Sequence, residues 1–492
     1  MKLRHSLLSV VSLALAMAAC DLASPDLPSN DFRRHQGMLQ VAGGGAQMSD
    51  WQPGTCTADR HRAFVNYYLQ HGYYYHQQMP DIDYRTYPFS VEQLFYDLTQ
   101  HAVQEDIFSF VTSQQGRDDS AGGVQRERFG LSWLVNSSNE LRISQVDSNG
   151  PAYEAGVRRG QQVVAISGIP VQVIEFDGYR LWQTSQLREA IDQNSMVLQI
   201  AGLAEPIEIN RADFISQPLP VISKISNPHD GNKSLAYVQL NTFAQQDAEL
   251  QLAKAALAVQ QMQASDLLLD FRYNSGGSAH LANLLVSMIA GQDRLGSTSV
   301  RFQHNENLRA WDQEYRLQDQ LAQPWPELED LGIAVDRMPL LSGINRVYFL
   351  TSPNTCSAPE MAILALQGLD IETILVGGRT CGKPQFSYRF DNCTLSYAPI
   401  AGLYYNALNQ TMTPGQGLPA QQQQQEDAKH DFTDPNEALL RHVLHHQAFG
   451  QFAPAAIAEG VQLQSQQGIK RQLGVSWYFE QPAMPITELS PP

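Results

Sequence analysis

The chain has 492 residues, a formal net charge of −17 and 43% hydrophobic residues. This length is sufficient for two or three domains, each with a conventional apolar core. The acidic balance argues against binding to nucleic acid and against an electrostatic hold on anionic lipid, because both would repel a negatively charged surface.

The first 20 residues are typical of a targeting segment. A basic start is followed by an apolar run at residues 7–17 and by small residues that lead to Cys20. This ending is similar to that of bacterial lipoprotein signals, which implies a lipid on Cys20 and a place in the cell envelope, facing the periplasm. Asp21 favours the inner membrane by the same resemblance, and an ordinary cleaved signal with a chance cysteine is the alternative. No later run is long enough for a confident membrane span, so the lipid would be the only anchor.

The next two segments are predicted to be a linker and a helical region. Residues 21–50 are rich in Pro, Ser, Gly, Asp and Gln, a composition typical of a flexible linker. Residues 51–120 are expected to form a helical N-terminal region. Its two predicted helices lie at 56–76 and 91–103, with Ser90 as the cap of the second helix.

Residues 123–210 carry a set of short motifs of one kind. Phe129, Gly130 and Leu131 resemble the peptide-binding loop and first strand of a PDZ domain, and residues 150–157 and 160–168 resemble its short helix and its tight turn. The resemblance implies that backbone N–H groups near Gly130 and Leu131 hold the carboxylate of a peptide that adds to an exposed strand. The alternative is a domain that only braces or covers its neighbour.

Residues 211–448 are predicted to form an α/β catalytic domain. Apolar strands at 235–240, 267–271 and 347–350 alternate with predicted helices at 248–262 and 360–369. Alternation of this kind is typical of a layered fold with much parallel pairing.

Ser357 is the candidate nucleophile. It lies between an apolar strand and an apolar helix, so its hydroxyl is held on a rigid turn, and the backbone N–H of Ala358 at the helix start can face a developing negative charge. Lys383 in the next Gly-rich turn is the candidate base, because a neutral lysine can accept a hydroxyl proton. Its pKa would have to fall from about 10.4 to near neutral. A helix-capping serine and a surface lysine are the alternative.

Three blocks in fixed order resemble the C-terminal processing, or tail-specific, serine peptidases. They are Leu-Leu-Leu-Asp-Phe-Arg-Tyr-Asn-Ser-Gly-Gly at 267–277, Thr-Cys-Ser-Ala-Pro-Glu at 355–360, and Gly-Gly-Arg-Thr-Cys-Gly-Lys at 377–383. The resemblance implies a crotonase/Clp-like spiral fold and a Ser/Lys dyad. It also implies an oxyanion hole from the N–H groups of Ala358 and Gly276, although the adjacent glycine, Gly277, remains open as the donor. Many relatives place a glutamine four residues after the lysine. Here that position is Ser387, and Gln385 is the candidate orienting residue.

The activity implied by this resemblance is a serine endopeptidase that binds apolar C-terminal tails and needs no metal or other cofactor. Two other classes remain as hypotheses. One is a non-catalytic lipoprotein that binds protein tails or a partner lipoprotein, and the other is an esterase on a related fold. An adaptor lipoprotein is a further candidate partner.

The five cysteines leave an even number once Cys20 carries a lipid. The remaining four allow three pairings in an oxidising compartment. We expect Cys381 to pair with Cys393, because the two flank a predicted hairpin. Cys356, beside Ser357, is an alternative nucleophile. No zinc-ligand spacing is present, and the histidines of residues 442–446 are expected to lie on a solvated helix face.

Two stretches have no firm interpretation. Residues 301–341 interrupt the catalytic domain and are either a lid over the cleft or a surface excursion. Residues 449–492 form a C-terminal extension rich in Gln and Pro that matches no motif.

Overall fold

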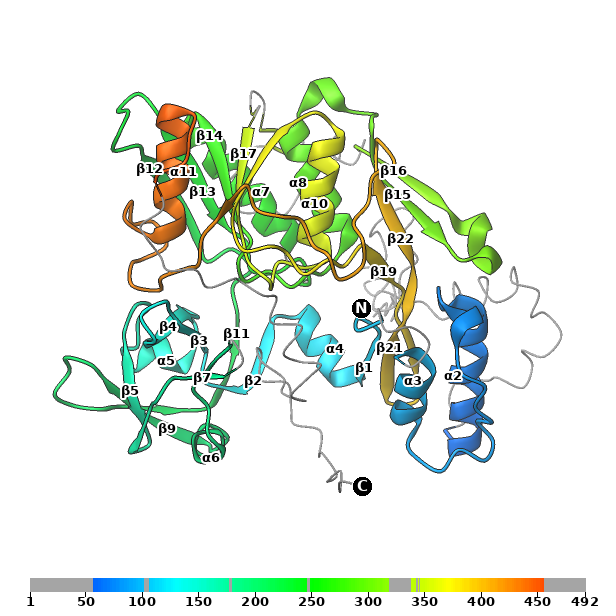
Figure 1. The fold of residues 1–492 in the computed structure, drawn as a ribbon. Helices are drawn as coiled ribbons and strands as arrows, with labels where there is room; N and C mark the ends of the chain where they lie inside the picture. The colour runs from blue at the N-terminus through cyan, green and yellow to red at the C-terminus, as the bar shows by residue number, and fades with distance from the viewer. Residues whose placement is uncertain are drawn as a thin grey trace, which may run out of the picture.

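The computed structural model describes residues 56–100, 106–176, 179–245, 248–317, 338–341, 344 and 346–454. The predicted signal with Cys20, the linker, and most of the C-terminal extension lie outside these residues. Figure 1 shows an α/β body, a smaller sheet-rich domain below it and a group of N-terminal helices beside both. No helix in the described part of the chain has the length and apolar character that a bilayer crossing requires.

The α/β body is built on a six-stranded sheet. Its order is β12-β13-β14-β17-β18-β23, and all neighbouring pairs are parallel except β12 with β13. The strands are β12 (Val221–Ser226), β13 (Ser234–Gln239), β14 (Asp266–Asp270), β17 (Arg346–Thr351), β18 (Glu372–Gly377) and β23 (Gln422–Gln423).

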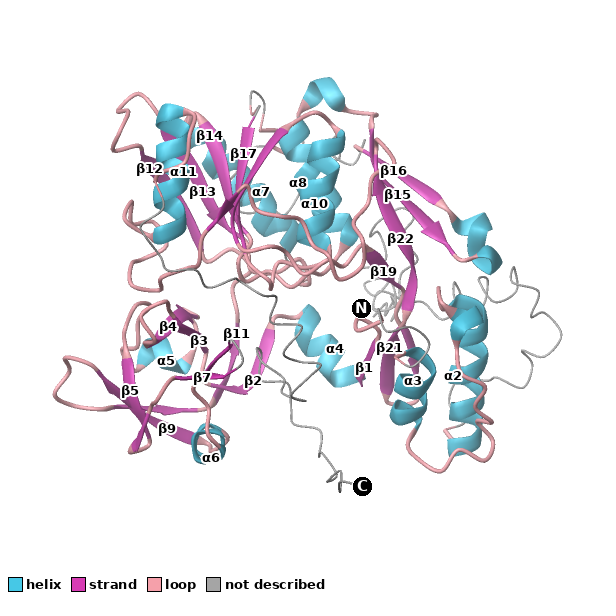
Figure 2. Ribbon diagram, in the orientation of Figure 1, coloured by secondary structure: helices cyan, strands magenta, loops and turns pink. Residues whose placement is uncertain are grey.

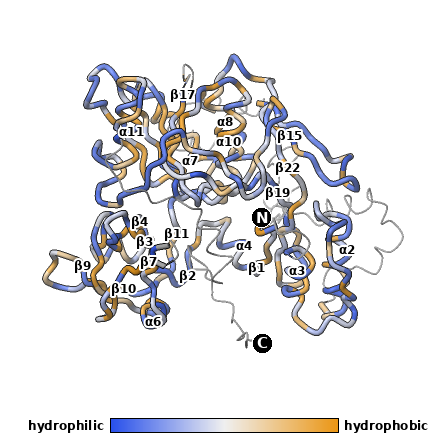
Figure 3. Tube along the Cα trace, in the orientation of Figure 1, coloured by the Kyte–Doolittle hydropathy of each residue, from blue (hydrophilic) through white to orange (hydrophobic). Residues whose placement is uncertain are grey.

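Helices cover both faces of this sheet, as Figure 2 shows. One face is covered by α7 (Ala248–Met262), α8 (Ala279–Ala290) and α10 (Ala358–Gly368), the other by α11 (Ala438–Phe449). Successive strand residues point to opposite faces. Leu267 and Leu269 therefore join the core under the three helices, whereas Leu268 packs with α11. Figure 3 shows the apolar residues gathered between these layers. The predicted α/β fold class is confirmed.

A second sheet, in the order β16-β15-β22-β19, lies against α10. Its strands are β15 (Thr298–His304), β16 (Gln313–Arg316), β19 (Gln385–Ser387) and β22 (Ile400–Asn406), and the turns η3 (Gln292–Arg294) and η4 (Glu306–Trp311) adjoin β15. The first part of the uncertain stretch 301–341 is thus a hairpin that extends this sheet. Residues 318–337 lie outside the described residues.

The N-terminal region comprises α2 (Ala58–Gly72), η2 (His76–Gln78), α3 (Val91–Thr99), β1 (Phe110–Ser113) and α4 (Gln114–Ala121). The Ser90 hydroxyl caps α3 by accepting a hydrogen bond from the N–H of Gln93 at 3.2 Å, as the sequence predicts. β1 pairs with β21 (Leu395–Ala398), which pairs with β20 (Phe390–Asn392). The region therefore shares one core with strands that follow Lys383.

The sheet-rich domain lies between two strands that pair with each other, β2 (Val124–Arg128) and β11 (Ala212–Ile215). Between them the chain forms β3 (Leu131–Val135), β4 (Leu141–Val146), α5 (Pro151–Glu154), β5 (Val163–Ile166), β6 (Ile169–Pro170), β7 (Ile174–Phe176), β8 (Tyr179–Leu181), α6 (Ser185–Ile191), β9 (Ser195–Ile200) and β10 (Ile207–Asn210). This antiparallel pair makes the domain an insertion between the N-terminal region and the α/β body.

A buried charge cluster joins the sheet-rich domain to the α/β body. Arg159 lies 2.6 Å from the Glu426 carboxylate and stacks over the ring of Phe432 at 4.0 Å. Glu426 also accepts a hydrogen bond of 2.7 Å from the hydroxyl of Tyr273, in the turn after β14. Arg272 of the same turn lies 3.3 Å from Glu426. We call Arg159, Glu426, Tyr273 and Arg272 the interdomain cluster.

Candidate active site

Ser357 lies where β17 ends and α10 begins, on the turn that the sequence predicts. Its φ is 68°, in the left-handed region that non-glycine residues rarely adopt, so the surrounding structure must stabilise it. Part of that support comes from Thr355, whose hydroxyl donates to the carbonyl of Phe271 at 2.8 Å. The turn places the N–H of Ala358 in the first position of α10, where helix geometry supplies no partner.

The glycine turn after β14 approaches Ser357 closely. The N–H of Cys356 donates to the carbonyl of Asn274 at 3.1 Å. Gly276 has φ +124°, and a Cβ at that position would lie 3.2 Å from the Cβ of Ser357. Only a residue without a side chain leaves space between this turn and the nucleophile for a substrate carbonyl.

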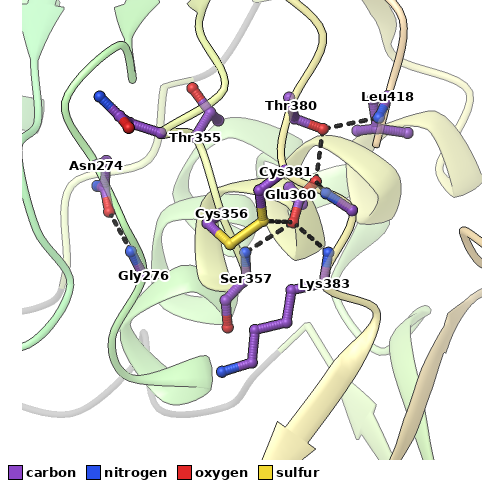
Figure 4. Close-up of a disulfide and its surroundings, with 12 residues drawn as sticks. Asn274, Gly276, Thr355, Cys356, Ser357, Glu360, Thr380, Cys381, Lys383 and Leu418 are labelled. Carbon is purple, nitrogen blue, oxygen red and sulfur yellow. Dashed lines mark hydrogen bonds between the residues drawn. A yellow bond between two sulfur atoms is a disulfide. The ribbon is translucent and has the colours of Figure 1, made fainter. Parts of the chain in front are cut away.

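The N–H of Gly276, one of the two predicted oxyanion donors, already has a partner. It donates to the side-chain oxygen of Asn274 at 3.0 Å, as Figure 4 shows. Asn274 is fully buried, and its amide nitrogen donates to the carbonyl of Leu240 at 3.0 Å, which fixes the side chain. A substrate oxyanion would have to compete with Asn274 for this donor. The oxyanion role of Gly276 stays a prediction.

Lys383 follows β18, the parallel neighbour of β17, so its turn reaches the same edge of the sheet as Ser357. Figure 4 shows the Lys383 amine pointing toward the Ser357 side chain. Burial lowers the pKa of Lys383 from 10.5 to about 8, against the opposing charges of Asp106 and Glu360. The amine lies 5.4 Å from the centre of the Phe108 ring. Residues just before β1 thus contribute to the surroundings of the base.

Glu360 holds the Ser357 and Lys383 turns together from within α10. Its Oε2 accepts hydrogen bonds from the N–H groups of Ser357 at 2.8 Å and Lys383 at 2.9 Å. Its Oε1 accepts from the N–H of Gly382 at 2.7 Å and from the hydroxyl of Thr380 at 2.5 Å. Burial raises the pKa of this carboxyl, and these hydrogen bonds oppose the rise. One carboxylate therefore sets the distance between the backbones of the two candidate catalytic residues.

Tyr404 on β22 faces the carbonyl groups of the same two residues. Its hydroxyl lies 3.0 Å from the carbonyl oxygen of Lys383 and 3.4 Å from that of Ser357. The sequence alone predicts no role for Glu360 or for Tyr404. For Glu360 a signal existed, because a glutamate three residues after a helix-capping serine is the pattern of a capping box.

The disulfides differ from the expected pairing. Cys356 is bonded to Cys381, and Cys393 is bonded to Cys56, so the predicted Cys381–Cys393 pair is wrong. The prediction assumed a hairpin between Cys381 and Cys393. Instead β19, the strand after Lys383, pairs with β22, and Cys393 lies in the turn between β20 and β21. Cys356 and Cys381 follow the ends of the neighbouring parallel strands β17 and β18, a signal that could have paired them.

The same bond removes Cys356 as the alternative nucleophile in this structure, because its sulfur is no longer a thiol. Gln385, the candidate orienting residue, is fully buried on β19. Its side-chain nitrogen donates to the hydroxyl of Tyr75 at 3.4 Å, and its side-chain oxygen has no hydrogen-bond partner among the described residues. An orienting role toward Lys383 stays a prediction.

The predicted peptide-binding residues lie at the start of β3. Phe129 is buried in the core of the sheet-rich domain, and Gly130 adopts φ +76° immediately before Leu131 opens the strand. Within the described residues β4 is the strand that β3 pairs with, and the Val135 carbonyl of β3 accepts a hydrogen bond of 3.3 Å from the side chain of Gln425.

Comparison with known proteins finds similarity in two parts of the chain. Residues 234–413 match the family model of peptidase family S41, and residues 142–200 match that of the PDZ domain. A carboxyl-terminal-processing protease from Synechocystis sp. is 26% identical over 149 residues, which are 30% of this chain and 34% of that protein. The aligned region thus spans about a third of the curated relative. A candidate S41 protease of known structure from Bacteroides fragilis is 20% identical, with a TM-score of 0.59, over 78% of this chain and 97% of its own.

Proposed function

Because the chain carries a peptidase family S41 domain and a PDZ domain, we propose that it is a serine endopeptidase that binds protein C-terminal tails and cleaves peptide bonds with Ser357 and Lys383. The observation that carries this proposal is the pairing of a strained, helix-capping serine with a lysine whose pKa burial lowers to about 8. A structural lysine has no need of such an environment, whereas a general base requires it.

In the proposed reaction, neutral Lys383 accepts the proton of Ser357 as the hydroxyl attacks the substrate carbonyl. The N–H of Ala358, with that of Gly276 or Gly277, stabilises the oxyanion. The protonated lysine then donates to the leaving amine, which frees the first product and leaves an ester on Ser357. Water repeats the cycle on that ester, with Lys383 again as the base.

Substrate capture is proposed to occur by strand addition to β3. An extended tail would add as a strand on the side of β3 opposite β4, and the backbone near Gly130 and Leu131 would hold the terminal carboxylate. Apolar C-terminal tails are the proposed substrates, and an adaptor lipoprotein is a proposed partner. The interdomain cluster joins the PDZ domain to the α/β body.

A cell-envelope location facing the periplasm, with a lipid on Cys20, completes the proposal. Two disulfides support it, because such bonds persist in oxidising compartments and are rare in reducing ones.

The test is cleavage of an unfolded protein that ends in either an apolar or a charged tail. Ser357→Ala and Lys383→Ala are each expected to lower kcat/KM by about 1,000-fold or more, since each removes a member of the reacting pair. Ser226→Ala and Lys224→Ala, at exposed positions of β12, are the matched controls and should retain wild-type rates. A wild-type chain that binds tails and cleaves none of them would contradict the proposal and favour a non-catalytic binding protein.

A further inference from the structure

The Cys356–Cys381 disulfide occupies a distinctive position relative to the proposed catalytic residues. Cys356 directly precedes Ser357, and Cys381 lies two residues before Lys383. The bond joins positions 25 apart in the sequence, with α10 and β18 between them, so the turns that carry the two cysteines are joined covalently. The N–H of Cys381 also donates to the carbonyl of Thr355 at 3.0 Å. Figure 4 shows the bond beside the Ser357 and Lys383 side chains.

The second observation concerns the Glu360 carboxylate, which lies against this bond. The Cys381 sulfur is 3.3 Å from Oε2, the oxygen that accepts the N–H groups of both Ser357 and Lys383. In the disulfide this sulfur carries no hydrogen and donates nothing. Reduced to a thiol, it would become a third donor to Oε2 and would compete with the two backbone groups that this oxygen holds.

We propose that the Cys356–Cys381 disulfide is a positioning element of the Ser357/Lys383 dyad, and that the chain hydrolyses peptide bonds at its full rate only while this bond is intact. The inference rests on the proposed peptidase function. Neither cysteine touches the reacting atoms. The bond acts by holding two turns at a fixed separation, and a displacement of about 1 Å between a nucleophile and its base can cost about 100-fold in rate.

Reduction by a dithiol is the step that would inactivate the chain. A thiolate of the reagent attacks the sulfur of Cys356, the less buried of the two residues, and the sulfur of buried Cys381 leaves with the electron pair of the broken bond. The second thiol of the reagent then displaces Cys356. Two electrons and two protons pass to the protein, which holds two thiols, and the reagent becomes a cyclic disulfide. The Cys381 sulfur leaves beside the Glu360 carboxylate, which disfavours a thiolate there, so reduction should be slow.

The second disulfide provides a matched control within the same chain. Cys56–Cys393 joins the start of α2 to the turn between β20 and β21, and Cys393 is separated from Lys383 by two strands. A general effect of losing a crosslink should follow removal of either bond. An effect on the position of the dyad should follow only the loss of Cys356–Cys381.

The experiment uses the full chain with Cys56→Ala and Cys393→Ala, in which Cys356–Cys381 is the bond that remains to be reduced. Dithiothreitol is titrated in, the reduced fraction is read by alkylation and peptide mass, and kcat and KM are measured on an unfolded protein with an apolar tail. We expect kcat to fall in proportion to the reduced fraction, toward about 100-fold at completion, with KM and tail binding unchanged. Reoxidation should restore kcat.

Two further variants separate positioning from folding. The double variant Cys356→Ala with Cys381→Ala should have the same low kcat and should not respond to dithiothreitol. The double variant Cys356→Ala with Cys381→Ser should have a still lower kcat, because the introduced hydroxyl can donate to Glu360. Retained tail binding and circular dichroism would establish that both variants fold. A kcat that stays at the wild-type value after complete reduction would overturn the inference.

A measurement that requires no peptidase activity tests the same inference independently. Competitive labelling of the Lys383 amine with acetic anhydride across pH reports its pKa. Breaking Cys356–Cys381 should move this value from about 8 toward 10.5, and breaking Cys56–Cys393 should leave it in place. An inactive wild-type chain would refute the proposed function alone, and the labelling would still decide whether the bond positions Lys383. An unchanged labelling profile would refute that positioning.

Discussion

Lys383 combines two opposed requirements at one residue. In its proposed role as a base it must be neutral near the working pH, and burial of its amine favours this by disfavouring the charged form. Asp106 and Glu360 act in the other direction, because their negative charges favour the protonated amine. The balance leaves the pKa at about 8, where a lysine is partly neutral and still able to return its proton to a leaving group.

This balance makes a prediction about pH. The kcat/KM of the wild-type chain should rise with pH through an apparent pKa of about 8 and level off above it, as Lys383 loses its proton. Peptide cleavage can be assayed from about pH 6 to about pH 9. A kcat/KM that does not change over this range would contradict the role of Lys383 as the base.

The same group should influence stability with a defined sign. The pKa of Lys383 is about 8 in the folded chain and near 10.5 in the unfolded chain, so folding disfavours the protonated amine below pH 8 and carries no such cost above pH 10.5. At neutral pH the free energy of unfolding of Lys383→Met should therefore exceed that of the wild type by about 2 kcal/mol, after allowance for partial exposure of the lysine. The difference should shrink as pH rises through this window. Lys224→Met at an exposed site of β12 should show no such pH dependence.

At the scale of elements, the turn between β14 and α8 is the part that tolerates least change. A Cβ on Gly277 would lie 2.2 Å from the carbonyl carbon of Phe243, and the backbone there has φ +136°. The N–H of Phe243 donates to the carbonyl of Gly276 at 2.9 Å, so the turn and this segment are locked together. Any side chain at Gly277 must push the glycine turn away from the backbone at Phe243.

A pair of glycine variants measures this constraint. Gly277→Ala should lower the free energy of unfolding by at least about 3 kcal/mol, because it adds a backbone overlap to an unfavourable φ. Gly156→Ala also has a positive φ, +93°, but its Cβ would meet nothing within 4 Å, so its cost should be about 1 kcal/mol. Chemical denaturation at 25 °C compares the two. Equal losses would mean that φ alone, and not the contact with Phe243, constrains the turn.

Much of this architecture could be predicted from the sequence. The apolar runs of β14 and β17 and the periodicity of α7 are local signals, and three motifs placed Ser357, Lys383 and the glycine turn near one another. The contacts that hold these residues are not local. The partnership of Cys56 with Cys393, the approach of Phe108 to Lys383 and the contact of Tyr404 with both carbonyls depend on how distant strands pair, and no spacing in the sequence records that pairing.

At the scale of the whole molecule, the interdomain cluster is a buried link between the domain proposed to bind tails and the proposed catalytic site. The side chain of Arg159 is only 5% exposed and that of Glu426 only 11%, so their charges are largely removed from water. Tyr273 and Arg272, on the α/β side, belong to the turn that also carries the glycines beside Ser357. A movement of the PDZ domain that displaced Arg159 would therefore act on a turn of the active site.

A double-mutant cycle on Arg159→Met and Glu426→Gln tests the strength of this link. Each single change breaks the buried Arg159–Glu426 pair, while Glu426 keeps Arg272 and Arg159 keeps Glu437 nearby. Each should therefore destabilise the chain by up to about 3 kcal/mol, whereas the double variant should lose much less than the sum. Thermal unfolding gives the four values. Strictly additive losses would show that the pair does not couple the two domains.

The Cys56–Cys393 bond gives the whole chain an uncommon covalent layout. It joins positions that are 337 residues apart, so the backbone between them forms a closed ring that includes the PDZ domain, Ser357 and Lys383. A single nick anywhere in that ring opens it without releasing a fragment. A peptidase that clips its own loops would accordingly keep its mass on a non-reducing gel, and the damage would become visible only after a thiol reagent separates the pieces.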